Sequence, residues 1–167
     1  EQINKIKNLL EKSLSYYKSK NTIDLKMESM KGLFNGTKNL YIHANYANDI
    51  IDAIDISKKY KVKKIVIIGG EDAVKVMNKL KENDIPVILN RVHRLPKNED
   101  SQIHEPYQQP AILEKNGILF AFSYEGDMEA MGARNLPFSA GTAVAYGLDY
   151  EKAVSALTLN TAKILGV

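Results

Sequence analysis

The chain has 167 residues, of which 44% are hydrophobic and 26% charged, a composition typical of one soluble globular domain. Its 23 basic and 20 acidic residues are mixed along the sequence and give a net charge of +3, so we expect neither nucleic-acid binding nor membrane insertion. The absence of cysteine excludes disulfides and thiolate metal sites, but it leaves the compartment open between cytoplasm and periplasm.

Apolar residues at helical spacing predict a first helix over residues 2–18 and a second over 23–33, which the Asn35-Gly36 pair would end. The chain then alternates between short apolar runs and amphipathic segments. The predicted strands are 39–44, 64–68, 86–90 and 118–123. The predicted helices that follow the first strand are 47–60, a segment opened by Glu71 and Asp72, 107–116, and a broken helical region from Asp127 to the end, with Asp149 as one cap.

Strands that alternate with helices in this way predict an α/β fold with a parallel sheet and right-handed crossovers. Two architectures have this pattern: a small open, doubly wound sheet, and half of an eight-stranded (β/α)8 barrel. The sequence contains neither a dinucleotide fingerprint nor a phosphate-binding loop with its lysine. Gly69-Gly70 could bind an anion before a helix, although such a pair more often makes only a tight turn.

A long irregular segment, residues 91–106, follows the third predicted strand. Loops of this length in compact domains are often functional, and loops after barrel strands build active sites. We therefore consider His93 and His104 candidate substrate-binding residues. The alternative is that both histidines are simply solvated.

The closing segment reads RNLPFSAGTAVAYGLDYEKAVSALTLNTAKILGV, residues 134–167. Its AL…T…NxAxxLG pattern resembles the end of the amidohydrolase superfamily barrel, and most closely the imidazolonepropionase-like branch. The resemblance extends upstream, where the four predicted strands match barrel strands 5 to 8. It implies that the chain is a single domain, residues 1–167, forming the C-terminal half of a TIM (β/α)8 barrel, with the N-terminal half and a β-sandwich domain absent from this chain.

The resemblance also implies a metal site, because these enzymes usually hold one or two divalent metals, zinc or iron. His43 matches the histidine of the fifth strand and is the candidate metal ligand; a histidine bonded to a neighbouring loop is the alternative. The sixth-strand position reads Ile68-Gly69-Gly70, without a histidine, and the eighth lacks its aspartate. Glu125 and Asp127 are therefore candidate catalytic proton shuttles or displaced ligands, or alternatively the start of a capped helix.

Two further residues are candidates for contact with a substrate. The guanidinium of Arg134 is shaped to bind a carboxylate, although an ordinary ion pair would explain it equally well. Tyr124 follows the fourth strand and could line a pocket, or it could only pack.

The function that the resemblance implies is metal-dependent hydrolysis of a carbon–nitrogen, non-peptide bond in a small cyclic or linear amide. The alternative is a catalytically degenerate homologue that acts as a binding or scaffold subunit. The expected partners are a small-molecule substrate and, because half a barrel leaves two open sheet edges, a second copy or the missing half-barrel.

Overall fold

The computed structural model describes residues 2–19, 23–96, 100–125 and 129–167. The strands are β1 (Leu40–Ala44), β2 (Ile65–Gly69), β3 (Val87–Leu89) and β4 (Phe120–Phe122). The helices before β4 are α1 (Gln2–Lys18), α2 (Leu25–Asn35), α3 (Ala47–Lys59), η1 (Ala73–Val76), α4 (Met77–Glu82) and α5 (Glu105–Lys115). Those after it are α6 (Glu129–Gly132), η2 (Ala133–Asn135), α7 (Leu136–Ala145), α8 (Tyr150–Leu157) and α9 (Leu159–Leu165).

The four strands form one parallel sheet in the order β1-β2-β3-β4. Each strand therefore pairs with its predecessor, and the order never reverses as it does at the switch point of a doubly wound sheet. Unidirectional order is the arrangement of consecutive strands in a barrel wall. The α/β class and the barrel-segment architecture predicted from the sequence are confirmed.

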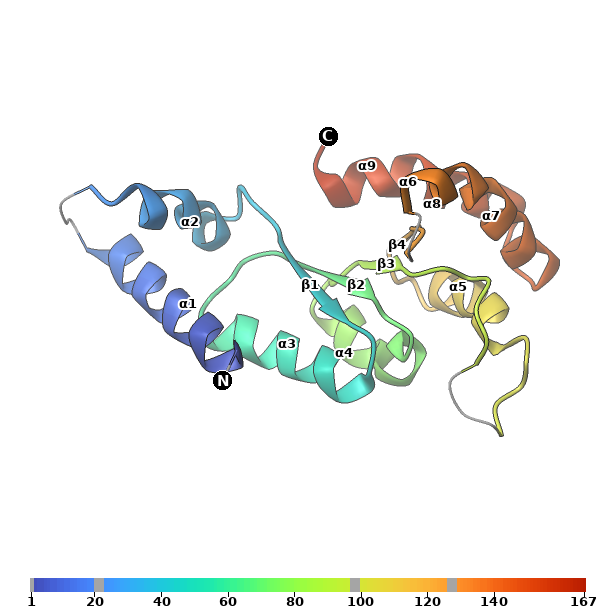
Figure 1. Cartoon of the computed structure of the whole chain (residues 1–167), viewed down its shortest axis with the longest axis horizontal. Coiled ribbons are helices and arrows are strands. Elements are labelled where there is room, and N and C mark those ends of the chain that lie inside the picture. Colours follow the sequence, from blue (N-terminus) through green and yellow to red (C-terminus); the bar gives the residue numbers. More distant parts are fainter. Residues whose placement is uncertain (1, 20–22, 97–99, 126–128) are drawn as a thin grey trace.

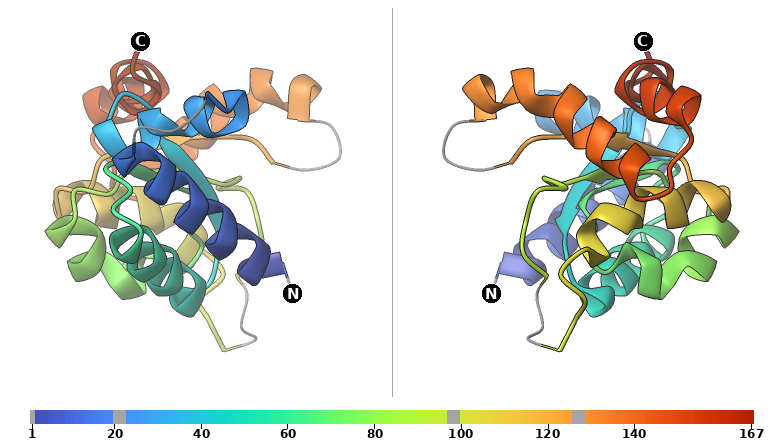
Figure 2. Two further views of the ribbon diagram at one scale, coloured as in Figure 1. Left: turned by 90° about the vertical axis from the view of Figure 1, so that its left-hand side faces the viewer. Right: turned by 90° about the vertical axis from the view of Figure 1, so that its right-hand side faces the viewer.

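One face of the sheet carries most of the hydrophobic core. The side chains at alternate strand positions, such as Ile67, Val87 and Phe120, are at most 2% exposed and belong to one cluster with residues of the covering helices. α3, α4 and α5 supply Ile54, Leu80 and Leu113 and others to this cluster. Figure 2 shows these three helices gathered on one side of the molecule, with α9 on the other. α7 and α8 add Ala143, Ala153 and Ala156 to the same cluster.

The opposite face of the sheet is much less covered. Its buried residues are Val66 and Ala121, which pack with Ile164 of α9 and the partly buried Ile88. α9 is tied there by Asn39 Nδ2, which donates to the Ile164 carbonyl at 2.8 Å, and by Asn160 Nδ2, which donates to the Phe120 carbonyl at 3.1 Å. α9 thus covers this face at the amino ends of the strands and leaves the carboxyl ends open.

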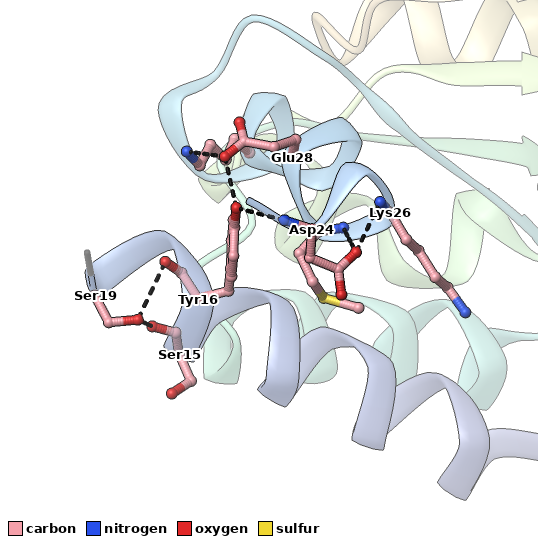
Figure 3. Close-up of polar contacts among 8 residues, drawn as sticks. Ser15, Tyr16, Ser19, Asp24, Lys26 and Glu28 are labelled. Carbon is pink, nitrogen blue, oxygen red and sulfur yellow. Dashed lines mark hydrogen bonds and ion pairs between the residues drawn. The ribbon is translucent and has the colours of Figure 1, made fainter. Parts of the chain in front are cut away.

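α1 and α2 form a hairpin that lies apart from the C-terminal helices, at the left of Figure 1. Asp24 caps α2 by accepting from the backbone N–H groups of Lys26 and Met27, and the Tyr16 hydroxyl donates to Glu28 at 2.7 Å (Figure 3). The hairpin joins the sheet through a small cluster that includes Leu10, Leu33 and Tyr60.

The sequence located every strand, but several helix boundaries differ. α2 begins at Leu25, not at residue 23, because Asp24 caps it. Glu71 and Asp72 precede a short 3-10 turn that begins at Ala73, so the expected regular helix starts only at Met77. Asp149 caps α8 as predicted, by accepting from the Lys152 N–H. No helix within the described part of the chain is both long and apolar enough to cross a membrane.

Candidate functional site

A polar hollow of about 190 Å³ lies at the carboxyl ends of the strands, on the open face of the sheet. Its walls come from all four strands or the turns that follow them: His43, Ala44, Asn45, Tyr46, Asp49, Ile68, Asn90 and Glu125. Active sites of βα barrels lie at this end, where the loops after the strands converge. The hollow is therefore the candidate functional site.

The hollow brings together His43 of β1 and Glu125, which follows β4. These two strands form opposite edges of the sheet, so their side chains share a hollow only because the sheet curls. The histidine and the carboxylate that the sequence singled out are thus two walls of one site. Both side chains are exposed and accessible to a ligand.

Asn45 enters the hollow because the end of β2 has no side chain. Gly69 has φ +105°, and a Cβ atom there would lie 2.1 Å from Asn45 Oδ1. The Asn45 backbone is fixed by the next turn, since its carbonyl accepts from the Asp72 N–H at 2.8 Å. The position at which the resemblance would place a histidine is therefore filled by the Asn45 amide.

Asn90 supplies a second amide beside the first. Its Nδ2 donates to Asn45 Oδ1 at 3.4 Å, and its backbone N–H donates to the Gly69 carbonyl at 3.2 Å. Its Oδ1 is buried and accepts no hydrogen bond from the described residues. An amide oxygen buried without a donor destabilises the folded state, and because this atom is buried it is not accessible from the hollow.

Glu125 is positioned by the loop after β3. Arg91 Nε donates to the Glu125 carbonyl at 2.8 Å, and Nη2 donates to the same oxygen. The Arg91 guanidinium also lies 4.6 Å from the centre of the Tyr124 ring. The Tyr124 ring packs against Gly132 as well, where a Cβ atom would lie 2.0 Å from Tyr124 Cε1. Tyr124 therefore braces this loop and does not line the hollow.

His93 and His104 lie outside the hollow, in an aromatic cluster that joins the long loop to α5 and α7. His93 Nε2 is 2.7 Å from Thr142 Oγ1, and its ring meets Tyr107 edge-on. His104 precedes α5, and its ring stacks on Tyr146 at 5.9 Å. The substrate-binding role expected of the two histidines stays a prediction, but these contacts give both rings a place in packing.

The structure describes one of the two remaining candidates. Arg134 lies in η2 with an exposed side chain and is not among the lining residues. Asp127 falls outside the described residues. Arg134 therefore does not contribute to the geometry on which the site rests.

The described residues do not fit a divalent metal by themselves. Within residues 2–19, 23–96, 100–125 and 129–167, no three His, Asp or Glu side chains gather where they could hold an ion. A catalytic zinc ion is typically held by three protein ligands of this kind. The amides of Asn45 and Asn90, which occupy the site beside His43, are weaker donors to zinc than imidazole or carboxylate.

A larger hollow, about 1100 Å³, opens at the amino ends of the strands, and Lys63 and Lys163 are among its walls. It is bounded by the loops that enter the strands and by α9, and it contains none of the predicted site residues. In a βα barrel this end serves stability, so we assign the functional site to the smaller hollow.

Sequence reasoning missed Asn45, Asn90 and Arg91. Each amide directly follows an apolar strand, and such a position at the end of a parallel strand is a usable signal. The pairing of the two amides through Gly69 depends on neighbouring strands and is not visible in the sequence.

No family model and no curated protein matches the chain. A crystal structure of an amidohydrolase from Thermotoga maritima MSB8 is similar, with a TM-score of 0.78 and 28% sequence identity. The match covers 98% of this chain but 44% of that protein, so the chain spans less than half of the length of its structural relative.

The similarity extends over nearly the whole chain and is one of sequence as well as fold. It supports the amidohydrolase superfamily at the coarse level. The imidazolonepropionase-like branch stays a prediction.

Proposed function

We propose that the protein is an amidohydrolase-like hydrolase that acts on a carbon–nitrogen bond of a small amide. The observation that carries the proposal is the shared hollow, in which His43 and Glu125 meet from opposite edges of the sheet. The similarity to the Thermotoga maritima amidohydrolase supports the same reaction class.

Hydrolysis of an amide requires attack by water on the carbonyl carbon and delivery of a proton to the leaving nitrogen. Asp49 and Glu125 both line the hollow, and we assign that proton transfer to Glu125, whose backbone is held at the hollow by the Arg91 contact to its carbonyl. His43 lies on the opposite wall, where it can orient the substrate. If a metal is bound, His43 would be one of its ligands, and further ligands would have to complete the set, because the described residues do not supply three.

The test is amide hydrolysis by the natural full-length protein, measured as amine or ammonia released from small amides, with bound zinc and iron quantified in parallel. General acid–base groups contribute about 100-fold or more, so Glu125→Gln should lower kcat by at least that factor. Glu114→Gln is the matched control, because Glu114 pairs with Lys152 away from the hollow. Full activity of Glu125→Gln would contradict the proposed role.

A second candidate is a degenerate homologue that binds a small molecule without hydrolysing it. It is favoured by the end of β2, where Gly69 and Asn45 leave no room for a ligand side chain. Binding without product, together with no metal after full loading, would select this candidate. Metal retained by the unaltered protein and lost in His43→Ala would select the metal-dependent enzyme.

A further inference from the structure

Gln109 is a buried polar side chain that the proposed function leaves without a role. It lies in α5, is 7% exposed, and makes hydrogen bonds in two directions. Its Nε2 donates to the Gly70 carbonyl at 2.6 Å and to the Glu71 carbonyl at 3.3 Å, and its Oε1 accepts from Arg94 Nη2 at 3.3 Å. One side-chain amide therefore joins α5, the turn after β2 and the segment between β3 and α5.

These partners fix the orientation of the Gln109 amide. In the reversed orientation its oxygen would face the two carbonyl oxygens, and its nitrogen would face the Arg94 guanidinium, which has no acceptor. Arg94 is held in turn by Glu71, with Nη1 3.9 Å from Oε2 and the two side chains 20% and 25% exposed. The amide thus presents its donor N–H groups to the turn.

The turn after β2 is poorly restrained by its own residues. Gly69 has φ +105° and Gly70 has φ +63°, and glycine loses more conformational freedom on folding than any other residue. Contacts with neighbouring segments must therefore hold the turn. The Gly70 N–H donates to the Ala44 carbonyl at 2.9 Å, and the Gly70 carbonyl accepts from the Ala73 N–H at 2.9 Å as well as from Gln109. Gln109 thus ties the carbonyl side of the turn to α5.

The turn sets the position of Asn45, which lines the hollow. A Cβ atom at Gly69 would lie 2.1 Å from Asn45 Oδ1, so the Asn45 amide packs directly on the turn. The Asn45 carbonyl also accepts from the Asp72 N–H at 2.8 Å. A displacement of the turn is therefore transmitted to this wall of the hollow.

We propose that Gln109 is a positioning residue of the site: by holding the carbonyls of the turn after β2, it keeps the Asn45 wall of the hollow in the shape that binds the substrate. Arg94 contributes by fixing the Gln109 amide. A preformed wall lowers the cost of ordering on binding, so loss of Gln109 should weaken substrate binding more than it slows the chemistry at Glu125. The effect on binding rests on the proposed function, whereas the effect on Asn45 does not.

The test replaces Gln109 by methionine in the natural full-length protein. Methionine is also unbranched and favours helix, so α5 is kept while both hydrogen bonds to the turn are lost. Gln108→Met is the matched control, because Gln108 is the preceding residue of α5 and is not a partner of the turn. NMR follows the signals of the Asn45 side-chain amide, and KM and kcat are measured for a small amide that the unaltered protein hydrolyses.

In Gln109→Met we expect the Asn45 amide signals to shift and KM to rise about three- to tenfold, the range expected from the loss of a hydrogen bond, with kcat changed less than KM. Gln108→Met should match the unaltered protein in all three quantities. Unmoved Asn45 signals in folded Gln109→Met, or a constant KM where those signals move, would overturn the proposal.

A second variant decides the question if Gln109→Met does not fold. Arg94→Met removes the donor to Gln109 Oε1 and leaves Gln109 itself in place. A shift of the Asn45 amide signals in Arg94→Met would support the positioning role, and unmoved signals would overturn it.

The two proposals fail separately. If the unaltered protein hydrolyses no amide, with or without metal, the hydrolase is wrong, and the Asn45 signals alone decide the positioning role. If amides are hydrolysed but Gln109→Met leaves both KM and the Asn45 signals unchanged, the positioning role is wrong and the hydrolase stands.

Discussion

The two faces of the sheet differ in what covers them. The face toward α3, α4 and α5 is sealed by a continuous apolar core, whereas the other face is covered at its amino end by Ile164 and stays open at its carboxyl end. The difference separates two tasks. The sealed face supplies stability, and the open face leaves room for His43, Asn45, Asn90 and Glu125.

The sharpest test of this division uses two neighbouring isoleucines of β2. Ile67 is fully buried on the sealed face, and Ile68 is half-buried on the open face. In the 167-residue chain, Ile67→Ala should lower the free energy of unfolding by about 2–5 kcal/mol through lost burial and a cavity. Ile68→Ala should cost about 1 kcal/mol, because less apolar area is lost. Urea unfolding measures the free energy of unfolding of both variants. Equal losses in the two variants would contradict the claim that the sealed face supplies the stability.

A smaller loss of stability is expected from a substitution at Gly69, where the open face meets the turn after β2. Gly69→Ala places a methyl group onto Asn45 Oδ1 and forces alanine to adopt φ +105°, so we expect a loss of about 1–3 kcal/mol and displacement of the Asn45 amide. Gly117→Ala is the control, because Gly117 has φ +73° but no atom within 4 Å of the added Cβ.

Gly117→Ala should lose stability through backbone strain alone, without displacing any side chain. Thermal unfolding gives the stability of both variants, and the side-chain amide signals of Asn45 report its displacement. An unmoved Asn45 signal in Gly69→Ala would show that the close approach does not fix the amide.

The smallest effect is expected in the α1–α2 hairpin, away from both faces. Hydrogen bonds from Lys31 and Tyr16 lower the pKa of Glu28 from its ordinary value of 4.5. The folded state therefore gains stability above that ordinary pKa, and loses it as the pH falls through the lower, folded-state pKa. The side chains of Lys31 and Glu28 are 39% and 36% exposed, so solvent screens their interaction and the gain is small.

Tyr16→Phe removes one of these two donors and should raise the Glu28 pKa toward its ordinary value. Tyr17→Phe is the control, because Tyr17 is the next residue of the same helix and its ring packs on Phe34. NMR titration of the Glu28 carboxyl carbon measures the pKa in each variant. An identical Glu28 pKa in Tyr16→Phe and the unaltered protein would remove Tyr16 as a cause.

The sequence predicts the sealed face well and the open face poorly, for a physical reason. Buried strands such as β2 are continuous apolar runs, and Asp149 before α8 is a local cap, so both are readable from nearby residues. The return of α9 to the open face cannot be read from nearby residues, because it depends on contacts of Ile164 with Val66 and Ala121, which are distant in the sequence. The break at Thr158 that separates α8 from α9 has no glycine or proline to mark it.

The site residues also fall into two groups, those that the sequence predicts and those that it does not. His43 and Glu125 were found because a family resemblance pointed to the strand ends, and the curled sheet brings them together. Asn45 and Asn90 were missed because their hydrogen bond, and the glycine that permits it, join three strands. The pattern of neighbouring residues in the sequence contains no information on a contact between strands.

The measurement that tests the central claim most directly is a map of amide NMR shifts on the protein during titration with 2-pyrrolidinone, a small cyclic amide. We predict that the shifts concentrate on His43, Asn45, Asn90 and Glu125, at the carboxyl ends of the strands. Shifts concentrated instead on the amino-end hollow, around Lys63 and Lys163, would contradict the account.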